Sequence, residues 1–375
     1  MSVEPIRYPG LNLGAAHPEV NDRSEELMFG FWVFMMSDAI LFGLLFATYA
    51  TMLGVTAGGP GPAQLFDIKS VLIETLALLS SSFTYGIASL TLKYGHGRRR
   101  ALIAWLCVTL ALAFVFLWFE SHDFLSMVGK GAGPERSGYL SAFFALVPLH
   151  GLHVTTGCIW MIALIVQTAV YGIDRDVKHG LLRLGLFWHF LDIVWVAIFS
   201  LVYLGGLSCF FPRLSRGAVM THFDRSPRRL GGGGRNGWLG LPRAFGAFLV
   251  FAALPVTLAY LFGGAPARSE PGRNEQEEYR RDLRSYLWGI GLALALTAVP
   301  FAMVNWSAAP QFWLFVAIGT CALVQVVVHF RFFLHVDFSQ QKREDLHLIL
   351  FSTLILTTMI GGTIWILTNL AVRMH

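Results

Sequence analysis

The chain has few charged residues and few cysteines. Only 14% of its 375 residues are charged and 55% are hydrophobic, whereas a soluble domain typically carries about 25% charged residues. Its four cysteines are scattered and form no C-x-x-C pair, so we expect neither a disulfide framework nor a zinc site. These shortages argue against an ordinary soluble domain.

Long apolar runs take the place of charge. About 20 helical residues span the hydrocarbon of a bilayer, and backbone polar groups at that depth must be satisfied within the chain, which requires helices. We therefore predict an all-α fold, a polytopic membrane helix bundle with about nine transmembrane helices. The predicted spans are 27–53, 71–92, 101–119, 139–170, 181–206, 244–263, 286–304, 311–334 and 346–370.

Basic residues predict the orientation of these spans. The first 26 residues contain no apolar core, so we expect no cleavable signal peptide. The loop at 93–100 is rich in Lys and Arg, as cytoplasmic loops are. We therefore expect a cytoplasmic N-terminus and, after nine crossings, a periplasmic C-terminus. The net charge of +5 comes from such loops, and we expect no nucleic-acid partner.

A connector separates the first five spans from the rest. Residues 207–243 are rich in Arg and Gly and lack helical or strand periodicity, a composition typical of flexible linkers. The following segment, 244–263, is the weakest predicted span because Pro255 and several glycines interrupt it. If it crosses the membrane, most of the 28 Lys and Arg residues lie inside. If it does not, most lie outside, so the charge distribution favours a crossing.

Several polar side chains lie inside the apolar runs, where ionisable groups are expensive and often functional. His189 and Asp192 are three residues apart and would share one helix face. His150 and His153 have the same spacing, which would suit a metal or a haem iron. No Cys/His cluster or H-E-x-x-H motif accompanies them. We therefore favour hydrogen bonds between helices and to lipid head groups over a proton relay or a metal site.

A further polar group ends the eighth span. His329 and His335 flank Arg331 among aromatic residues. This arrangement predicts an interfacial site at which the arginine reaches the head groups.

Five stretches between residues 25 and 206 resemble one known family, subunit III of the haem-copper oxidases, in the five-helix form of bo-type quinol oxidases. Asp38 stands where many cytochrome c oxidase relatives have Glu. An Asp at this position resembles the quinol oxidase branch of the family. The matching stretches are 37–49, 74–82, 133–144, 150–155 and 187–195.

Residues 279–375 resemble subunit IV of the same oxidases, a small three-helix protein. The chain is thus predicted to hold two family members in series: residues 1–206 like subunit III, a connector with an added helix at 207–278, and 279–375 like subunit IV. The added crossing would let both units keep their own orientation. A read-through that joins two genes is the alternative.

The resemblance implies an accessory subunit of a proton-pumping quinol oxidase in a bacterial inner membrane, within the aerobic electron transport chain. Its partners would be oxidase subunits I and II and phospholipids, with ubiquinol as the substrate of the complex. The haems and copper would lie in subunit I, and we expect no catalytic, metal or cofactor residue in this chain. The rivals are an accessory subunit of a cytochrome c oxidase and an autonomous transporter.

The expected roles of the polar residues follow from the same resemblance. In the wider family a carboxylate of subunit III is linked to proton supply, and Glu74 is the candidate here. The pair at 189 and 192 is expected to help dock the catalytic partner. The candidate interhelical, lipid or subunit-interface residues are Asp38, Glu74, His150, His153, His189, Asp192 and Trp195.

Overall fold

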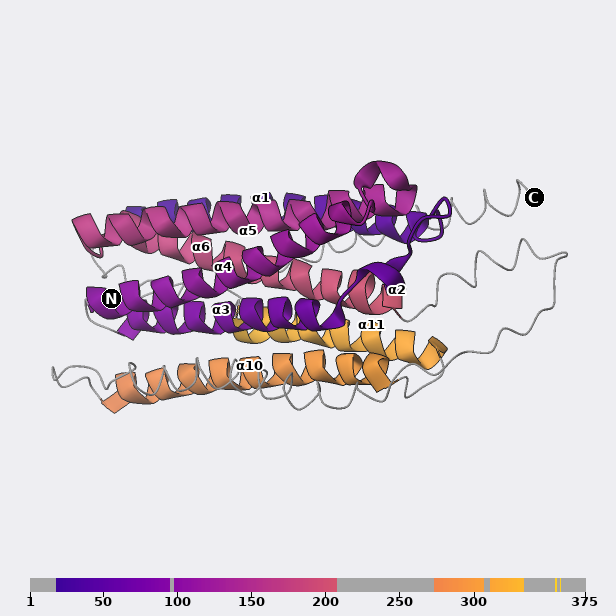
Figure 1. The fold of residues 1–375 in the computed structure, drawn as a ribbon. Coiled ribbons are helices and arrows are strands. Elements are labelled where there is room, and N and C mark those ends of the chain that lie inside the picture. Colours follow the sequence, from indigo (N-terminus) through magenta and orange to yellow (C-terminus); the bar gives the residue numbers. More distant parts are fainter. Residues whose placement is uncertain are drawn as a thin grey trace, which may run out of the picture.

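The structure is a computed structural model, and it shows a bundle of long helices that run along one common axis (Figure 1). No strand occurs among the residues that it describes, and seven of their helices are long and apolar enough to cross a membrane. The predicted polytopic helix bundle is therefore confirmed. The described residues are 18–94, 98–207, 273–306 and 311–333, with Ile355 and Thr358.

Seven of the nine predicted spans coincide with these helices. The sixth, 244–263, lies outside the described residues. The ninth, 346–370, also lies outside them except for Ile355 and Thr358, which are helical. The total of nine therefore stays a prediction.

The described residues from 18 to 207 are called here the N-terminal unit. Two short elements, α2 (Pro62–Leu65) and the 3-10 turn η1 (Pro134–Arg136), lie between its long helices. Its last helix continues through a π-helical segment, η2 (Ile198–Leu204), into α7 (Gly205–Leu207). The long helices are α1 (Pro18–Met52), α3 (Ile68–Tyr94), α4 (Arg99–Gly129), α5 (Gly138–Tyr171) and α6 (Arg175–Ala197).

The described residues from 273 to 333 are called the C-terminal unit. Helix α10 (Arg273–Trp306) is followed by α11 (Gln311–Val328), which runs on into a π-helical turn, η4 (His329–Phe333). Helix α10 packs along α3, and α11 packs on α6 (Figure 1). The two units therefore share one bundle.

Local sequence signals explain where α5 and α6 begin. The side chain of Ser137 accepts a hydrogen bond from the Leu140 N–H at 3.2 Å, and that of Asp174 accepts one from the Asp176 N–H at 2.8 Å. Ser and Asp are favoured at these positions because their oxygens satisfy N–H groups that the first helical turn leaves free. Helix α5 ends at Gly172, whose φ of 86° suits glycine.

The third predicted span was too short. The prediction ended at residue 119, at the polar run Glu120–Asp123, but α4 continues to Gly129. The polar run does not end the helix because Glu120 turns inward and is buried, and Met127, two turns further on, is buried as well. The longer helix brings an additional carboxyl group into the bundle.

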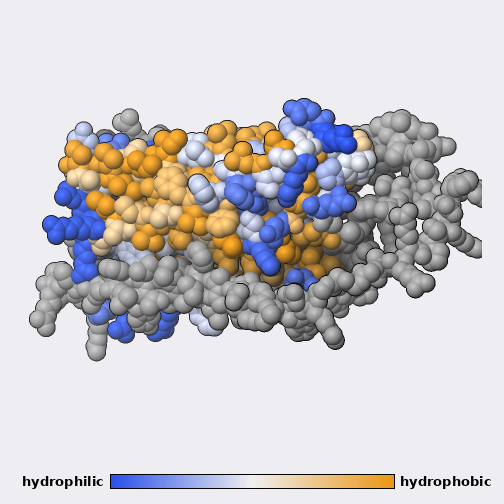
Figure 2. All heavy atoms as spheres, viewed as in Figure 1, coloured by the Kyte–Doolittle hydropathy of each residue, from blue (hydrophilic) through white to orange (hydrophobic). Residues whose placement is uncertain are grey.

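Helix α3 forms the centre of the bundle. In its apolar window 94% of the residues are buried, against 28% in α1, α10 and α11. The outer helices expose apolar side chains instead, such as Trp118 and Leu152. Figure 2 shows apolar residues along the middle of the visible face and hydrophilic ones towards its two ends. The outer surface thus suits lipid, and the interior holds the polar groups.

Candidate functional site: a polar seam between the two units

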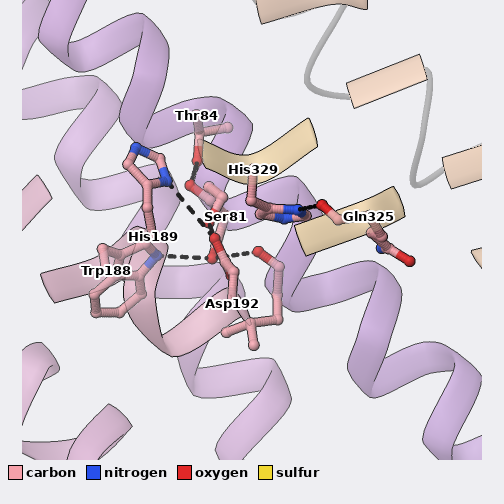
Figure 3. A network of polar contacts seen from close by, with 9 residues as sticks. Ser81, Thr84, Trp188, His189, Asp192, Gln325 and His329 are labelled. Atoms are coloured by element: carbon pink, nitrogen blue, oxygen red, sulfur yellow. Dashed lines mark hydrogen bonds and ion pairs between the residues drawn. The ribbon is translucent and has the colours of Figure 1, made fainter. Parts of the chain in front are cut away.

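The two units meet along a boundary that contains a buried polar cluster, here called the seam. It lies where α3 and α6 face the C-terminal unit, and Asp192 of α6 stands at its centre (Figure 3). The Ser82 hydroxyl of α3 donates a hydrogen bond to Asp192 Oδ2. His189 Nδ1 lies 3.7 Å from the same oxygen. Both members of the i, i+3 pair are almost completely buried.

A second hydrogen bond links α6 to α3 beside this carboxylate. The indole Nε1 of Trp188 donates to Ser81 Oγ at 3.0 Å (Figure 3). Small polar residues such as these serines let two helices approach closely and bond across the contact. Ser81 and Ser82 of α3 therefore form part of the contact surface for α6.

The C-terminal unit contributes His329, which is fully buried against the seam. Its Nδ1 lies 2.8 Å from the Gln325 carbonyl oxygen, and it is close enough to Asp192 to interact electrostatically. Gln325 Nε2 in turn donates to Thr297 Oγ1 at 3.0 Å, which ties α11 to α10. The Phe333 ring lies 5.4 Å from the ring of His189. The two buried residues of η4, His329 and Phe333, therefore both lie close to α6.

The seam also has packed and charged contacts near the first turns of α10. The Tyr286 ring sits so close to Gly86 of α3 that an added Cβ would lie 2.6 Å from its Cε1 atom. Lys93 Nζ lies 2.9 Å from Asp282 Oδ2, and the Tyr94 hydroxyl donates to the same oxygen at 2.8 Å. The two units are therefore joined by apolar packing, by the electrostatic contact between Asp192 and His329, and by a partly exposed ion pair with the Tyr94 hydrogen bond beside it.

His189 and Asp192 face a neighbour within their own chain. They are 5% and 1% exposed and face the C-terminal unit, and their predicted role in docking a catalytic partner stays a prediction. The sequence signal was right in one respect, because polar groups at membrane depth require a protein neighbour. The neighbour lies within the chain itself.

His150 and His153 have different partners, although both belong to α5. The His150 ring stacks on Trp195 at 5.4 Å, and Trp195 Nε1 donates to Thr75 Oγ1 at 3.1 Å. His153 Nε2 instead lies 3.7 Å from Asp38 Oδ2 of α1. Among the described residues no group of three or more His, Cys, Asp or Glu side chains could hold a metal ion.

Glu74 has no hydrogen-bond partner for either carboxyl oxygen among the described residues, although it is only 1% exposed. Beside it on α4 lies Glu120, which the sequence analysis missed. The predicted span ended at residue 119, so this carboxyl group fell just outside it. Its inward position became visible only with the length of α4.

The sequence did not single out three further polar residues as members of the seam. His329 was predicted at the membrane interface with Arg331, which stays a prediction; in the structure His329 is buried and Arg331 is exposed, and His335 lies outside the described residues. Gln325 and Thr297 gave no signal of their own, because single amide and hydroxyl groups are common in membrane helices. The spacing of Gln325 and His329, one helical turn apart, is the signal that the sequence offered.

Comparisons with known proteins match both units. Residues 13–207 match the family of cytochrome c oxidase subunit III, and residues 287–361 match the prokaryotic cytochrome c oxidase subunit IV family. The chain is similar to the cytochrome bo(3) ubiquinol oxidase subunit 3 of Pseudomonas aeruginosa, with 43% identity over 194 residues. That alignment covers 52% of this chain and 92% of the relative.

Two further relatives give the same picture. The cytochrome bo(3) ubiquinol oxidase subunit 3 of Pseudomonas putida is 45% identical over 187 residues, which are 50% of this chain and 89% of the relative. The probable quinol oxidase subunit 3 of Staphylococcus saprophyticus is 40% identical over 179 residues, which are 48% of this chain and 88% of the relative. In each case the alignment takes up about half of this chain.

Proposed function

Because the chain belongs to the cytochrome c oxidase subunit III family and also carries a segment that matches subunit IV, we propose that it is an accessory subunit of a quinol oxidase. The observation that carries this proposal is the order of the two matches, with a subunit III region followed by a subunit IV region in one chain. Relatives named as quinol oxidase subunit 3 support the choice of electron donor.

In this proposal the chemistry belongs to partner subunits. Subunits I and II would complete the complex, subunit I would carry the haems and copper, and the complex would oxidise ubiquinol, reduce oxygen to water and move protons. This chain would support assembly and hold phospholipid on its exposed apolar faces. The complex would lie in a bacterial inner membrane, with the N-terminus of this chain in the cytoplasm.

Purification through a tag on this chain tests the proposal. The complex, extracted in mild detergent, is expected to contain a haem-bearing large subunit and to reduce oxygen with ubiquinol as donor. A second preparation, tagged on the large subunit, serves as the control and should return this chain in equal amount. A preparation without haem would contradict the proposal.

The same preparation separates the two rival functions. A subunit of a cytochrome c oxidase would co-purify with a partner that holds a dinuclear copper centre and would oxidise cytochrome c rather than quinol. An autonomous transporter would move its substrate when this chain is reconstituted alone. Either result would replace the quinol oxidase proposal.

We also propose that the chain consists of two subunit-like regions, residues 1–206 and 279–375, joined by the connector at 207–278. The buried seam supports this division, because each region contributes its own polar groups to one shared contact. A protease site placed within the connector tests it. After cleavage the two fragments should remain together during gel filtration in detergent, and an intact mass of the uncut protein should match 41.6 kDa.

A substitution supplies the control for this cleavage experiment. The same cut in a chain with Asp192→Ala should release the C-terminal fragment more readily, because Ser82 and His329 lose their shared partner. Fragments that separate equally well with and without the substitution would show that the seam does not hold the two regions together.

A further inference from the structure

A second buried polar cluster lies about two turns before Ser81 on α3, where that helix packs against α4. Helices α3 and α4 are antiparallel, and Thr84 and Thr109 fix their register with hydroxyl oxygens 2.8 Å apart. About ten residues away along each helix, or about 15 Å at 1.5 Å per residue, this register brings Glu74 opposite Glu120. The two carboxyl groups are close enough to interact electrostatically.

Both carboxyl groups are enclosed by protein. Glu74 is 1% exposed and Glu120 is 3% exposed. Neither oxygen of Glu74, nor Oε1 of Glu120, has a hydrogen-bond partner among the described residues, and no ion pair within that part of the chain includes either group. Leaving a buried carboxyl group without hydrogen bonds is costly, so these oxygens indicate a bound partner such as water.

His150 of α5 is an independent sign of that ligand. Its ring is fully buried, and neither ring nitrogen has a hydrogen-bond partner among the described residues. The ring packs edge-on against Phe116, one turn before Glu120, at 5.9 Å. On its other side it stacks on Trp195, which is hydrogen-bonded to Thr75, the neighbour of Glu74. The imidazole therefore packs between Phe116, which precedes Glu120 by one turn, and Trp195, which is bonded to the neighbour of Glu74.

Gly151 shows that α5 makes room for the carboxyl group of Glu120. A Cβ added at Gly151 would lie 2.6 Å from Glu120 Oε2 and 3.1 Å from its Oε1. The lack of a side chain at this position lets the carboxyl group approach the backbone of α5 directly beside His150. The region around the two carboxyl groups is thus bordered by α3, α4 and α5.

The chemistry of this space favours water and a proton over a metal ion. Cations such as Ca²⁺ or Mg²⁺ take about six oxygen ligands, and the described residues contain no group that could hold one. A buried water typically makes about three hydrogen bonds to otherwise unsatisfied polar groups. Two neighbouring carboxyl groups in a medium of low dielectric do not both carry a charge.

We propose that Glu74, Glu120 and His150 enclose an internal proton-binding site, in which water bridges the two carboxyl groups and one proton is retained between them. The proton is held as a carboxyl O–H that donates to the bridging water, and the water donates to the second carboxyl group or to an imidazole nitrogen of His150. This site is separate from the seam and does not depend on which oxidase the chain joins.

Infrared spectroscopy of the purified complex tests this proposal. The wild-type protein should show a C=O stretching band of protonated carboxyl groups that shifts in D₂O. Glu74→Gln and Glu120→Gln should each change this band, and the double variant should lose the intensity of one carboxyl group. A control on the same helix, Thr91→Val, removes a hydroxyl that donates to the Ile87 carbonyl oxygen of α3 itself and should leave the band unchanged. An assembled variant with the full wild-type band would overturn the proposal.

A density map of the unmodified complex at a resolution that shows water provides a test that needs no variant. Water density between Glu74, Glu120 and His150 is the expected result. A metal ion, a lipid head group or direct contact without water at this position would overturn the proposal. The map therefore decides the question even if the double variant fails to assemble.

Discussion

Helix α3 carries polar contacts at two levels that are satisfied in different ways. At the seam, Ser81 and Ser82 have protein partners from α6, and the cluster extends into the C-terminal unit. At Glu74, one end of the same helix carries a carboxyl group without a partner among the described residues. The seam also contains atoms without a partner among the described residues, namely Asp192 Oδ1, His189 Nδ1 and His329 Nε2. Its serine hydrogen bonds nevertheless fix how α3 and α6 pack, whereas the Glu74 carboxyl group has none and leaves both oxygens for a ligand. The two levels should therefore respond to mutation in opposite ways.

The largest expected effect is at the seam. Asp192→Ala removes the acceptor of Ser82 and the charged neighbour of His329. Because hydrogen bonds to charged groups contribute about 1.5–3 kcal/mol, we expect a loss of about 2 to 3 kcal/mol in the free energy of unfolding. The measurement is unfolding in mixed detergent micelles. Asp192→Asn keeps an acceptor and should lose less; equal losses would show that the carboxylate is not specifically used.

The same small substitution at two glycines sharpens the contrast. In Gly86→Ala the new methyl group meets the rigid ring of Tyr286, and in Gly151→Ala it meets the movable carboxyl group of Glu120. Overpacking against rigid groups typically costs about 1–3 kcal/mol, so Gly86→Ala should destabilise by about 2 kcal/mol and Gly151→Ala by less. Thermal unfolding measures both. Gly291→Ala, where nothing lies within 4 Å of the new Cβ, is the control.

This pair of substitutions also has distinct secondary effects. Gly86→Ala should release the C-terminal fragment after cleavage of the connector, and Gly151→Ala should shift the carboxyl infrared band. If Gly151→Ala were the more damaging change, the Glu120 carboxyl group would be held rigidly, and the picture of an adaptable site would be wrong.

The smallest expected effect is at the carboxyl pair itself. Glu120→Gln keeps the shape of the side chain and removes one member of a carboxyl pair whose shared charge lacks a counterion among the described residues. Since a neutral isostere relieves the burial of charge, the free energy of unfolding should stay within about 1 kcal/mol of wild type, or rise. A circular dichroism melt checks this. A loss as large as that of Asp192→Ala would mean that Glu120 has a structural partner.

Hydropathy was sufficient for seven spans because each apolar run is long and its meaning is local. It failed at the end of α4, where the predicted span stopped before the polar residues 120–123. Two of these side chains are accommodated by neighbours distant in sequence: Glu120 lies against Gly151, and Asp123 is hydrogen-bonded to Ser70. A pattern along one helix cannot reveal a neighbour on another, and this is why the helix end was misplaced.

The candidate site was found in part. The sequence singled out His189 and Asp192 because ionisable groups are rare at membrane depth. It could not show that their neighbours are Ser82 and His329. Ser82 precedes His189 by 107 residues, and His329 follows it by 140. Nor could it show that the i, i+3 histidines of α5 turn to different partners, since helical spacing gives a shared face but not what packs on it.

The sequence by itself determined that this protein is a multi-pass helical membrane protein and, through its motifs, which family it belongs to. These properties depend on composition and on residues close together in the chain. Only the tertiary structure decided which polar groups meet, because helix packing brings together residues from separate spans. It placed one cluster as a joint between two units and another as an enclosed carboxyl pair, since in a low-dielectric interior the role of a polar side chain depends on its partners.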